Sequence, residues 1–424
     1  MQVRCGYNYG NYIEKSGVVM VITNVRVCDA QGERSVDVKV LGGKIAEVGS
    51  NLKGEPRIDG KGGYLLPGIV DTNVRLKDSQ LNGTNLQRLS SEALRGGVTT
   101  TVLAPDATPS VDNAIVLEFV QNHRRLEKGA KIETTVASTN EEELLSNIAI
   151  LLKRGAVAPY MTTSVSNNVA CRIAEYVKMY GVTLFCKAQD TSLSSVGVMT
   201  EGKIATKLGL VGIPPLGETV HVARMIEIAR NFGISILFKS IASPRSIEMI
   251  TRAKEEGIDV RCEVSIHHLL HCDEACDGFN TAAKLNPPLP SKENMERLVA
   301  FLKNGEVDLL TTLHQPNSPV NKEVAFADAA YGCAAIAEAL PLYYTKLVKG
   351  GMLTLPELLR LVSENPAAII GKEAGRIAPG MDADLLLFDP DAEVTVDAPD
   401  SLYRGETLSG RVVMAFREGE IVRL

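Results

Sequence analysis

Residues 68–104 read GIVDTNVRLKDSQLNGTNLQRLSSEALRGGVTTTVLA, and this stretch contains the unit from which the fold is built. Apolar and β-branched residues predict strands at Gly68–Val74 and Thr99–Ala104. Between them, Leu86–Leu94 has the i, i+3, i+4 apolar spacing of a helix, and Gly96 follows its end. A strand, a helix and a second strand in this order predict a parallel βαβ unit.

The same alternation continues through the centre of the chain. Further strands are expected at Ile132–Ala137, Ala156–Met161, Thr183–Lys187, Ser235–Ser240, Asp259–Ser265 and Val307–Thr312. Further helices are expected at Asn113–Leu126, Glu141–Lys153, Val169–Tyr180, Val220–Phe232, Arg245–Glu256 and Glu293–Leu302. This alternation predicts an α/β fold, a (β/α)8 TIM barrel over residues 67–374. A doubly wound sheet is the alternative, but no glycine-rich dinucleotide turn supports it.

The two ends of the chain have a different pattern. Residues 20–66 and 375–424 contain short strands punctuated by turn residues, such as Gly42-Gly43 and Gly62-Gly63. We expect these two segments to join into one small β-sandwich, a composite domain beside the barrel. Residues 1–19 precede the first strand and are expected to form a disordered tail.

Composition excludes several classes of protein. The 424 residues are 45% hydrophobic and 23% charged, as in an ordinary globular protein. The net charge of -6 gives no basic excess for nucleic acid or an anionic membrane. No apolar run is long enough to span a bilayer. Eight scattered cysteines are too few for a disulfide scaffold and favour a cytoplasmic location.

Five phrases, in one unbroken order, carry a resemblance to a known family. They are Leu66-Pro67-Gly68-Ile69-Val70-Asp71, Arg95-Gly96-Gly97-Val98-Thr99-Thr100, Glu263-Val264-Ser265-Ile266-His267-His268-Leu269-Leu270, Leu285-Asn286-Pro287-Pro288-Leu289, and the stretch from Gly375 to Leu385. Over residues 20–424 the chain resembles the amidohydrolase superfamily, and most closely its dihydroorotases. The resemblance implies zinc that activates water, and an aspartate base at the last barrel strand.

The zinc ligands that the resemblance implies are absent. Asn73 and Arg75 stand in place of the two histidines of the first strand, and Arg75 cannot lose its proton to bind a metal. The fourth strand offers neither a carboxylate nor a lysine. Lys187 and Ser240 replace the histidines of the fifth and sixth strands, and Leu313 replaces the aspartate base. We therefore predict no catalytic residue and no metal ligand at these degenerate positions.

The substrate-binding positions are also altered. By family position, the arginine that holds a substrate carboxylate falls on Lys77, which keeps the charge but loses the bidentate geometry. Asp106 replaces an asparagine and would repel an anionic substrate. Asn317 replaces a histidine, and only Asn286 is retained.

These losses predict a dihydroorotase-like pseudoenzyme of pyrimidine biosynthesis. The resemblance implies a structural role beside the catalytic chain of aspartate transcarbamoylase, in an oligomer. Zinc is the cofactor of the family, and none is expected here. One alternative is an active zinc-dependent cyclic amidohydrolase that cleaves a cyclic amide C–N bond. Another is an anion-binding or regulatory module.

Four basic residues are expected at the barrel mouth: Arg75, Lys77, Lys187 and Lys239. They could bind an anion such as a phosphate or carboxylate. We favour a structural role, in which they replace the charge of the lost metal, because a buried cation needs a partner. The candidate partners are Asp71, Asp78, Asp106 and Asp190.

Other chemistry-bearing residues have ordinary interpretations that we prefer. A local metal site is conceivable among His267, His268, His271, Cys272 and Cys276, but their spacing matches no strong zinc pattern. His314 is a candidate base without a second group, and Cys186 is best interpreted as a buried strand thiol. The small residues of Ala330–Leu340 predict a helix suited to close packing or a subunit contact.

Overall fold

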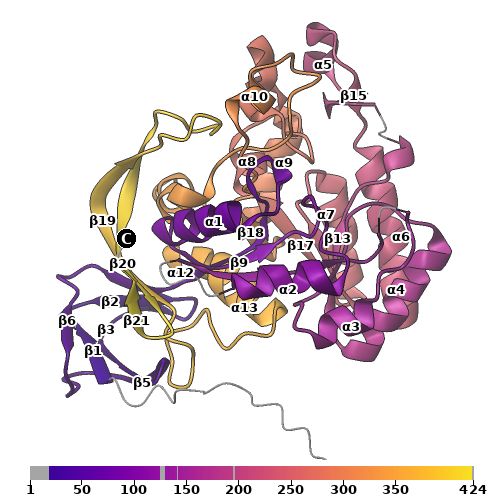
Figure 1. The fold of residues 1–424 in the computed structure, drawn as a ribbon. Helices are drawn as coiled ribbons and strands as arrows, with labels where there is room; N and C mark the ends of the chain where they lie inside the picture. Colours follow the sequence, from indigo (N-terminus) through magenta and orange to yellow (C-terminus); the bar gives the residue numbers. More distant parts are fainter. Residues whose placement is uncertain (1–18, 125–128, 141, 194–195, 423–424) are drawn as a thin grey trace, which may run out of the picture.

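The computed structural model describes residues 19–124, 129–140, 142–193 and 196–422 (Figure 1). The tail expected at residues 1–19 lies outside these ranges, except for Val19, which begins the first strand. The centre of the chain is an α/β barrel and the two ends are β-rich. The predicted fold class is confirmed.

Parallel strands form the barrel. They are β8 (Ile69–Val74), β9 (Val98–Leu103), β10 (Lys131–Thr134) with β11 (Val136–Ala137), β12 (Pro159–Met161), β13 (Thr183–Lys187), β16 (Ser235–Lys239), β17 (Val260–Ser265) and β18 (Leu309–Thr311). Neighbours in this sequence pair in parallel register, for example Phe185 with Leu237. The ring closes where β18 packs beside β8. Branched and aromatic residues, including Val70, Tyr160 and Phe185, fill the interior.

Helices surround this ring (Figure 1). The main ones are α1 (Gly83–Arg95), α2 (Ala114–Asn122), α3 (Ile148–Lys153), α4 (Asn167–Tyr180), α6 (Leu216–Phe232), α7 (Pro244–Glu255) and α9 (Lys292–Lys303). Side-chain caps start several of them; Asn82, for example, accepts a hydrogen bond from Asn85 N at 2.9 Å. Gly181, with φ of 61°, ends α4 in the left-handed conformation.

Two predicted helices differ from the structure. The first, expected at Glu141–Lys153, is reduced to α3, because the Asn140 side chain accepts bonds from the amides of Glu142 and Leu144 and holds a turn. The second, expected at Ala330–Leu340, is wrong. Gln315 N bonds to Cys333 O at 3.0 Å, so this part of the segment is extended. Only the short η5 (Ile336–Glu338) and α11 (Ala339–Tyr343) follow, and the suggested subunit contact loses its basis.

Both ends of the chain build the β-sandwich. One sheet has the order β5 (Lys44–Gly49), β4 (Asp37–Leu41), β1 (Val19–Thr23), β6 (Arg57–Asp59). The other has the order β21 (Glu420–Val422), β20 (Thr407–Arg417), β19 (Leu385–Thr395), β7 (Tyr64–Pro67), β2 (Arg26–Asp29), β3 (Gly32–Ser35). The antiparallel pair of β7 and β19 joins the N-terminal and C-terminal segments.

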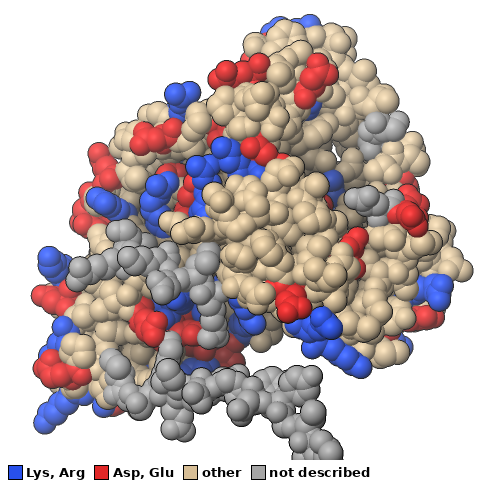
Figure 2. All heavy atoms as spheres, in the orientation of Figure 1, with Lys and Arg blue, Asp and Glu red and all other residues tan. Residues whose placement is uncertain are grey.

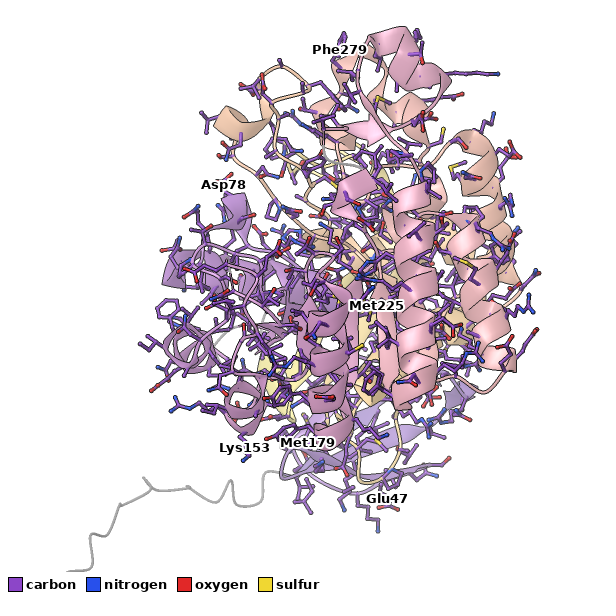
Figure 3. The ribbon with its side chains drawn as sticks, turned by 90° about the vertical axis from the view of Figure 1, so that its right-hand side faces the viewer. Glu47, Asp78, Lys153, Met179, Met225 and Phe279 are labelled. Atoms are coloured by element: carbon purple, nitrogen blue, oxygen red, sulfur yellow. The ribbon has the colours of Figure 1, made fainter. Side chains whose placement is uncertain are left out.

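The two ends of the barrel differ in what they carry. Asp78 and Phe279 lie at the end where the barrel strands finish, whereas Lys153 and Met179 lie at the opposite end (Figure 3). Long connections gather at the first end; they include α5 (Lys203–Leu208), β14 (Met199–Thr200), β15 (Gly212–Ile213), α8 (Ile266–Leu270) and α10 (Pro319–Lys322). In barrels of this kind, sites form at the carboxyl ends of the strands.

The outer surface carries charged residues of both signs, interspersed over the visible face (Figure 2). Within the described ranges, no helix combines the length and the apolar character needed to cross a membrane. The seven described cysteines are all free thiols, and five of them are buried.

Candidate functional site at the barrel mouth

A buried ion pair occupies the centre of the barrel mouth. Lys239, at the end of β16, pairs with Glu263 of β17, and the two side chains are 1% and 0% exposed. The Lys239 ammonium also donates to Thr72 O at 2.9 Å and lies 4.7 Å from the centre of the Phe185 ring. Burial lowers the pKa of Lys239, and Glu263 opposes this shift. A buried cation is stable here because a carboxylate and a carbonyl surround it.

Asn73 connects this pair to a second one. Its amide donates to Glu263 Oε1 and to Ser240 Oγ, both at 2.7 Å. Its carbonyl oxygen accepts from Arg75 Nη1 at 3.1 Å. Both amide hydrogens and the carbonyl oxygen of Asn73 are therefore engaged.

Arg75 and Asp106 form the second pair. The guanidinium donates through Nε and Nη2, with distances of 2.9–3.1 Å to the carboxylate oxygens. Tyr160 also hydrogen-bonds Arg75. Burial alone would raise the pKa of Asp106, but Arg75 outweighs it and the pKa lies below its ordinary value. This planar bidentate pair is one of the stronger charge-assisted contacts in proteins.

Lys187, at the end of β13, has a different environment. No hydrogen bond joins its ammonium to another residue in the described parts of the chain. The ammonium lies near the charges of Arg75 and Asp106. Burial, reinforced by Arg75, lowers the pKa of Lys187 to about 8, although Asp106 opposes the shift. Lys187 is therefore the cation of the mouth that lacks a hydrogen-bonded carboxylate among the described residues.

Asp71 and Leu313 lie at the meeting of β8 and β18. Asp71 accepts from the hydroxyl of Thr311 at 2.6 Å and from both the amide and hydroxyl of Thr312. Burial raises the pKa of this carboxyl, and the two threonines oppose the shift. Leu313 is buried and has φ of 46°, a conformation that costs energy for a branched side chain. It offers no group that transfers a proton.

The four residues expected to bind substrate have different surroundings in the structure. Asp106 is held by Arg75. Lys77 lies on η1 (Lys77–Ser79), where its positive charge favours the ionised carboxylates of Asp78 and Glu92. The Asn317 amide donates to Gln315 O and Tyr331 O at 3.1 and 3.0 Å. Asn286 lines a cavity together with Lys187.

The expected partners of the basic residues are correct in part. Arg75 pairs with Asp106 as predicted. The other expected acids are bound elsewhere: Asp71 to threonines, Asp78 to Ser318 and Asn321, and Asp190 to Ser192. Glu263 was missed as a partner, although it lies within the predicted strand Asp259–Ser265. Tyr160 and Thr72 were also missed, because nothing in their own sequence neighbourhood marks them as polar partners.

The buried histidines of the region are used in structural contacts. His267 lies 2.9 Å from Tyr403 OH and 3.3 Å from Cys333 Sγ, and His268 bonds with Ser265 Oγ and Pro287 O. The ring of His314 accepts from the amides of Ala335 and Ile336, and burial lowers its pKa to about 3. These rings are therefore neutral near pH 7.

The strand-end residues do not fit the zinc that the family resemblance implies. Within the described ranges, no three His, Cys, Asp or Glu side chains come together in a way that would hold a metal ion. Arg75, Lys187 and Lys239 instead bring positive charge to the mouth. Cys186 is no activated thiol either: burial raises its pKa to about 12.

The fold and the strand-end site define a class of protein: a (β/α)8 barrel joined to a β-rich domain, with its polar side chains gathered at the carboxyl ends of the strands. Within that class, the chain belongs to the Amidohydrolase family, which matches residues 64–422. The chain is a dihydroorotase-like member of it, as the following relatives indicate.

Two relatives are dihydroorotases at similar identity. The protein from Caldanaerobacter subterraneus subsp. tengcongensis is 34% identical over 421 residues, which covers 95% of this chain and 96% of the relative. The protein from Syntrophus aciditrophicus is 34% identical over 408 residues, with 91% and 94% covered. Among solved structures, L-hydantoinase (dihydropyrimidinase) from Arthrobacter aurescens superposes with a TM-score of 0.82 at 22% identity, covering 95% of this chain and 96% of the other. That structural likeness supports the fold alone.

Proposed function

We propose that this protein is a catalytically silent dihydroorotase homologue of pyrimidine biosynthesis, which acts as a structural partner of the aspartate transcarbamoylase catalytic chain. The main observation in favour of lost catalysis is the presence of two ion pairs at the mouth, Lys239 with Glu263 and Arg75 with Asp106. They lie among the strand ends at which the resemblance implies metal ligands, and Leu313 stands where it implies the base. The partnership itself follows from the resemblance, and the copies of this chain are expected to be oligomeric within such an assembly.

Electrostatics supports the silent interpretation. Two unit charges 4 Å apart interact by about 4 kcal/mol at an effective dielectric constant of 20. A divalent ion at this distance from the ammonium of Lys239 would be repelled by twice this energy. The Glu263 carboxylate, which could otherwise bind such an ion, is already paired with that ammonium. Leu313 in addition provides no acceptor for the proton of an attacking water.

The first test measures metal and turnover together. The purified, untagged protein is examined by elemental mass spectrometry and then assayed with carbamoyl aspartate and dihydroorotate in the presence of added zinc. We expect zinc well below one equivalent and no turnover above background. The Caldanaerobacter relative, prepared and assayed in parallel, is the positive control. Turnover that scales with protein and disappears with a chelator would instead support the zinc-dependent amidohydrolase.

The second test addresses the partner. The aspartate transcarbamoylase catalytic chain from the same organism is mixed with this protein, and the mixture is analysed by sedimentation velocity. We expect a complex that sediments faster than either component. Two independent boundaries at micromolar concentrations would contradict the structural partnership without affecting the conclusion on catalysis.

A further inference from the structure

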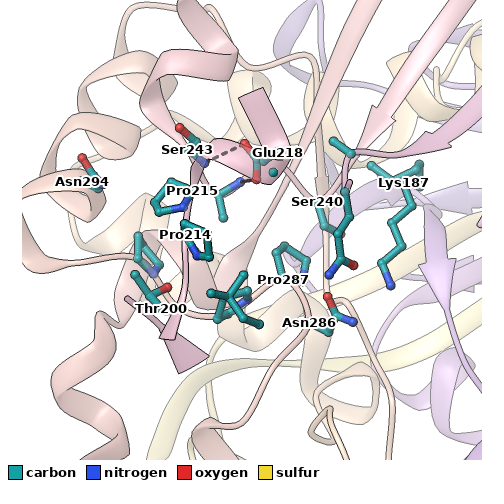
Figure 4. A pocket seen from close by; sticks show the side chains of 18 residues that line it. Lys187, Thr200, Pro214, Pro215, Glu218, Ser240, Ser243, Asn286, Pro287 and Asn294 are labelled. Atoms are coloured by element: carbon teal, nitrogen blue, oxygen red, sulfur yellow. Dashed lines mark hydrogen bonds between the residues drawn. The ribbon is translucent and has the colours of Figure 1, made fainter. Parts of the chain in front are cut away.

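A cavity opens beside the two ion pairs at the barrel mouth. It offers about 630 Å³ of empty space, including the part that is open to solvent. The enclosed part is about 50 Å³, which is room for a few water-sized groups and therefore for a short ligand. Lys187 and Asn286 extend toward the same part of this cavity (Figure 4). Much of the remaining wall is apolar, built from Ile213, Pro214, Pro215, Pro287, Pro288 and Pro290.

Lys187 is the polar group that distinguishes this cavity. Lys239 lines the same wall, but Glu263 and the carbonyl of Thr72 hold its ammonium. Glu218, on α6, also lines the cavity, but its carboxylate accepts from the amides of Ala242 and Ser243 and from Ser246 Oγ. In the described chain, the Lys187 amine has no such acceptor.

We propose that Lys187 is a nucleophilic amine site that forms an imine with a short, uncharged aldehyde or ketone bound in this cavity. The inference goes beyond the proposed function and does not depend on it. A lysine becomes a useful nucleophile when it is desolvated or placed beside another cation. Lys187 meets both conditions: the residue is half-buried at the strand end, where its amine is desolvated, and Arg75 is close to it.

The charges around the amine favour an uncharged ligand. Asp106 balances Arg75, and Glu263 balances Lys239. When Lys187 is neutral, these pairs leave no unpaired positive charge to hold a carboxylate. Burial and Arg75 lower the pKa of Lys187 to about 8, so a useful fraction of the amine is neutral near pH 7.

The proposed step needs no additional reactant. The Lys187 nitrogen attacks the carbonyl carbon, an N–C bond forms, and the C–O π bond breaks. A proton leaves the nitrogen and one reaches the oxygen, which gives a carbinolamine. Loss of one water then gives the imine, with no change of oxidation state. Asn286 is placed to donate to the carbonyl oxygen from the cavity wall (Figure 4).

Reductive alkylation tests the proposal on the full chain. The protein is treated at pH 7 with limiting propionaldehyde and sodium cyanoborohydride, and each lysine is quantified by peptide mass spectrometry. Lys178, which is exposed at the far end of α4, is the internal reference. We expect Lys187 to be alkylated about tenfold faster, because desolvation and Arg75 lower its pKa to about 8. Alkylation of Lys187 at or below the rate of Lys178 overturns the proposal.

Two variants separate reaction inside the cavity from general reactivity. Lys187→Arg keeps a cation but removes the primary amine, and it should abolish the fast alkylation. Ile213→Trp fills part of the cavity, and it should slow alkylation of Lys187 while that of Lys178 stays unchanged. An unchanged rate at Lys187 in the Ile213→Trp variant contradicts the cavity as the binding site. Because zinc content and dihydroorotate turnover are measured separately, these results do not bear on the proposed function.

Discussion

Lys239 and Glu263 pair across the neighbouring strands β16 and β17, with side chains that are almost completely removed from solvent. Removing one partner leaves the other as an unpaired buried charge, which costs about 3–5 kcal/mol. Lys239→Met and Glu263→Gln should each lower the free energy of unfolding by about that amount, measured by urea denaturation. The double change to Met and Leu should cost less than the sum of the two single changes.

The exposed pair of Lys207 and Asp277 provides the matched control. Their side chains are 60% and 54% exposed, and an ion pair of this kind contributes less than about 1 kcal/mol. Lys207→Met should therefore change stability little. Equal losses in the buried and exposed variants would contradict the central role of the mouth pair.

Asp106 should control the proton affinity of Lys187. Asp106 raises the pKa of that lysine, whereas Arg75 lowers it. Asp106→Asn removes the opposing negative charge, so the pKa of Lys187 should fall below about 8. The pH profile of Lys187 alkylation would then shift toward lower pH, while the profile of Lys178 stays in place. A shift toward higher pH would refute the charge arrangement described for the mouth.

Buried imidazoles should make the protein sensitive to acid. Burial lowers the pKa of His314 to about 3 and that of His268 to about 4, below the ordinary value of 6.5. Between pH 6.5 and these lowered pKa values, the unfolded chain binds protons at both histidines that the folded chain does not bind. The free energy of unfolding therefore falls as the pH decreases below about 6.5. Urea denaturation from pH 8 to pH 4 measures this loss. His268→Asn should reduce the slope, and His123→Asn, at the half-buried C-terminal end of α2, is the comparison variant.

Restoring two histidines should not restore catalysis. The double variant Asn73→His and Arg75→His supplies imidazoles at the first strand but leaves Lys187, Lys239 and Leu313 in place. It also leaves Asp106 without its arginine. We expect no dihydroorotate turnover in the presence of zinc, and a lower free energy of unfolding than for the unchanged protein. Turnover in this variant would mean that the later strands have been assigned wrongly.

The barrel could be predicted well because its signals are local. The strand at Thr183–Lys187 coincides with β13, and most helices begin or end within a few residues of their predicted bounds. The segment at Ala330–Leu340 has helical composition, but its backbone bonds with distant residues such as Gln315, and these tertiary contacts determine its shape. No pattern within the segment itself indicates such a partner.

The site was predictable in kind but not in detail. The replaced strand-end residues could be identified one by one, and the pairing of Arg75 with Asp106 was among the expected pairings. The partner of Lys239 could not be chosen, because Glu263 lies on the next strand and only the closed barrel brings its carboxylate to the ammonium. That Lys187 has no hydrogen-bonded carboxylate among the described residues likewise depends on the side chains that surround it.

The pairing of β7 with β19 joins segments that are separated by most of the chain, for example Leu65 with Leu387. The connection that follows β19 then places Tyr403 against His267 and Asp400 against the backbone of Asn317. During synthesis on the ribosome, strand β7 consequently remains without this neighbour until the barrel residues that separate it from β19 have been translated. One late segment thus completes the second sheet and also supplies contacts to His267 and Asn317.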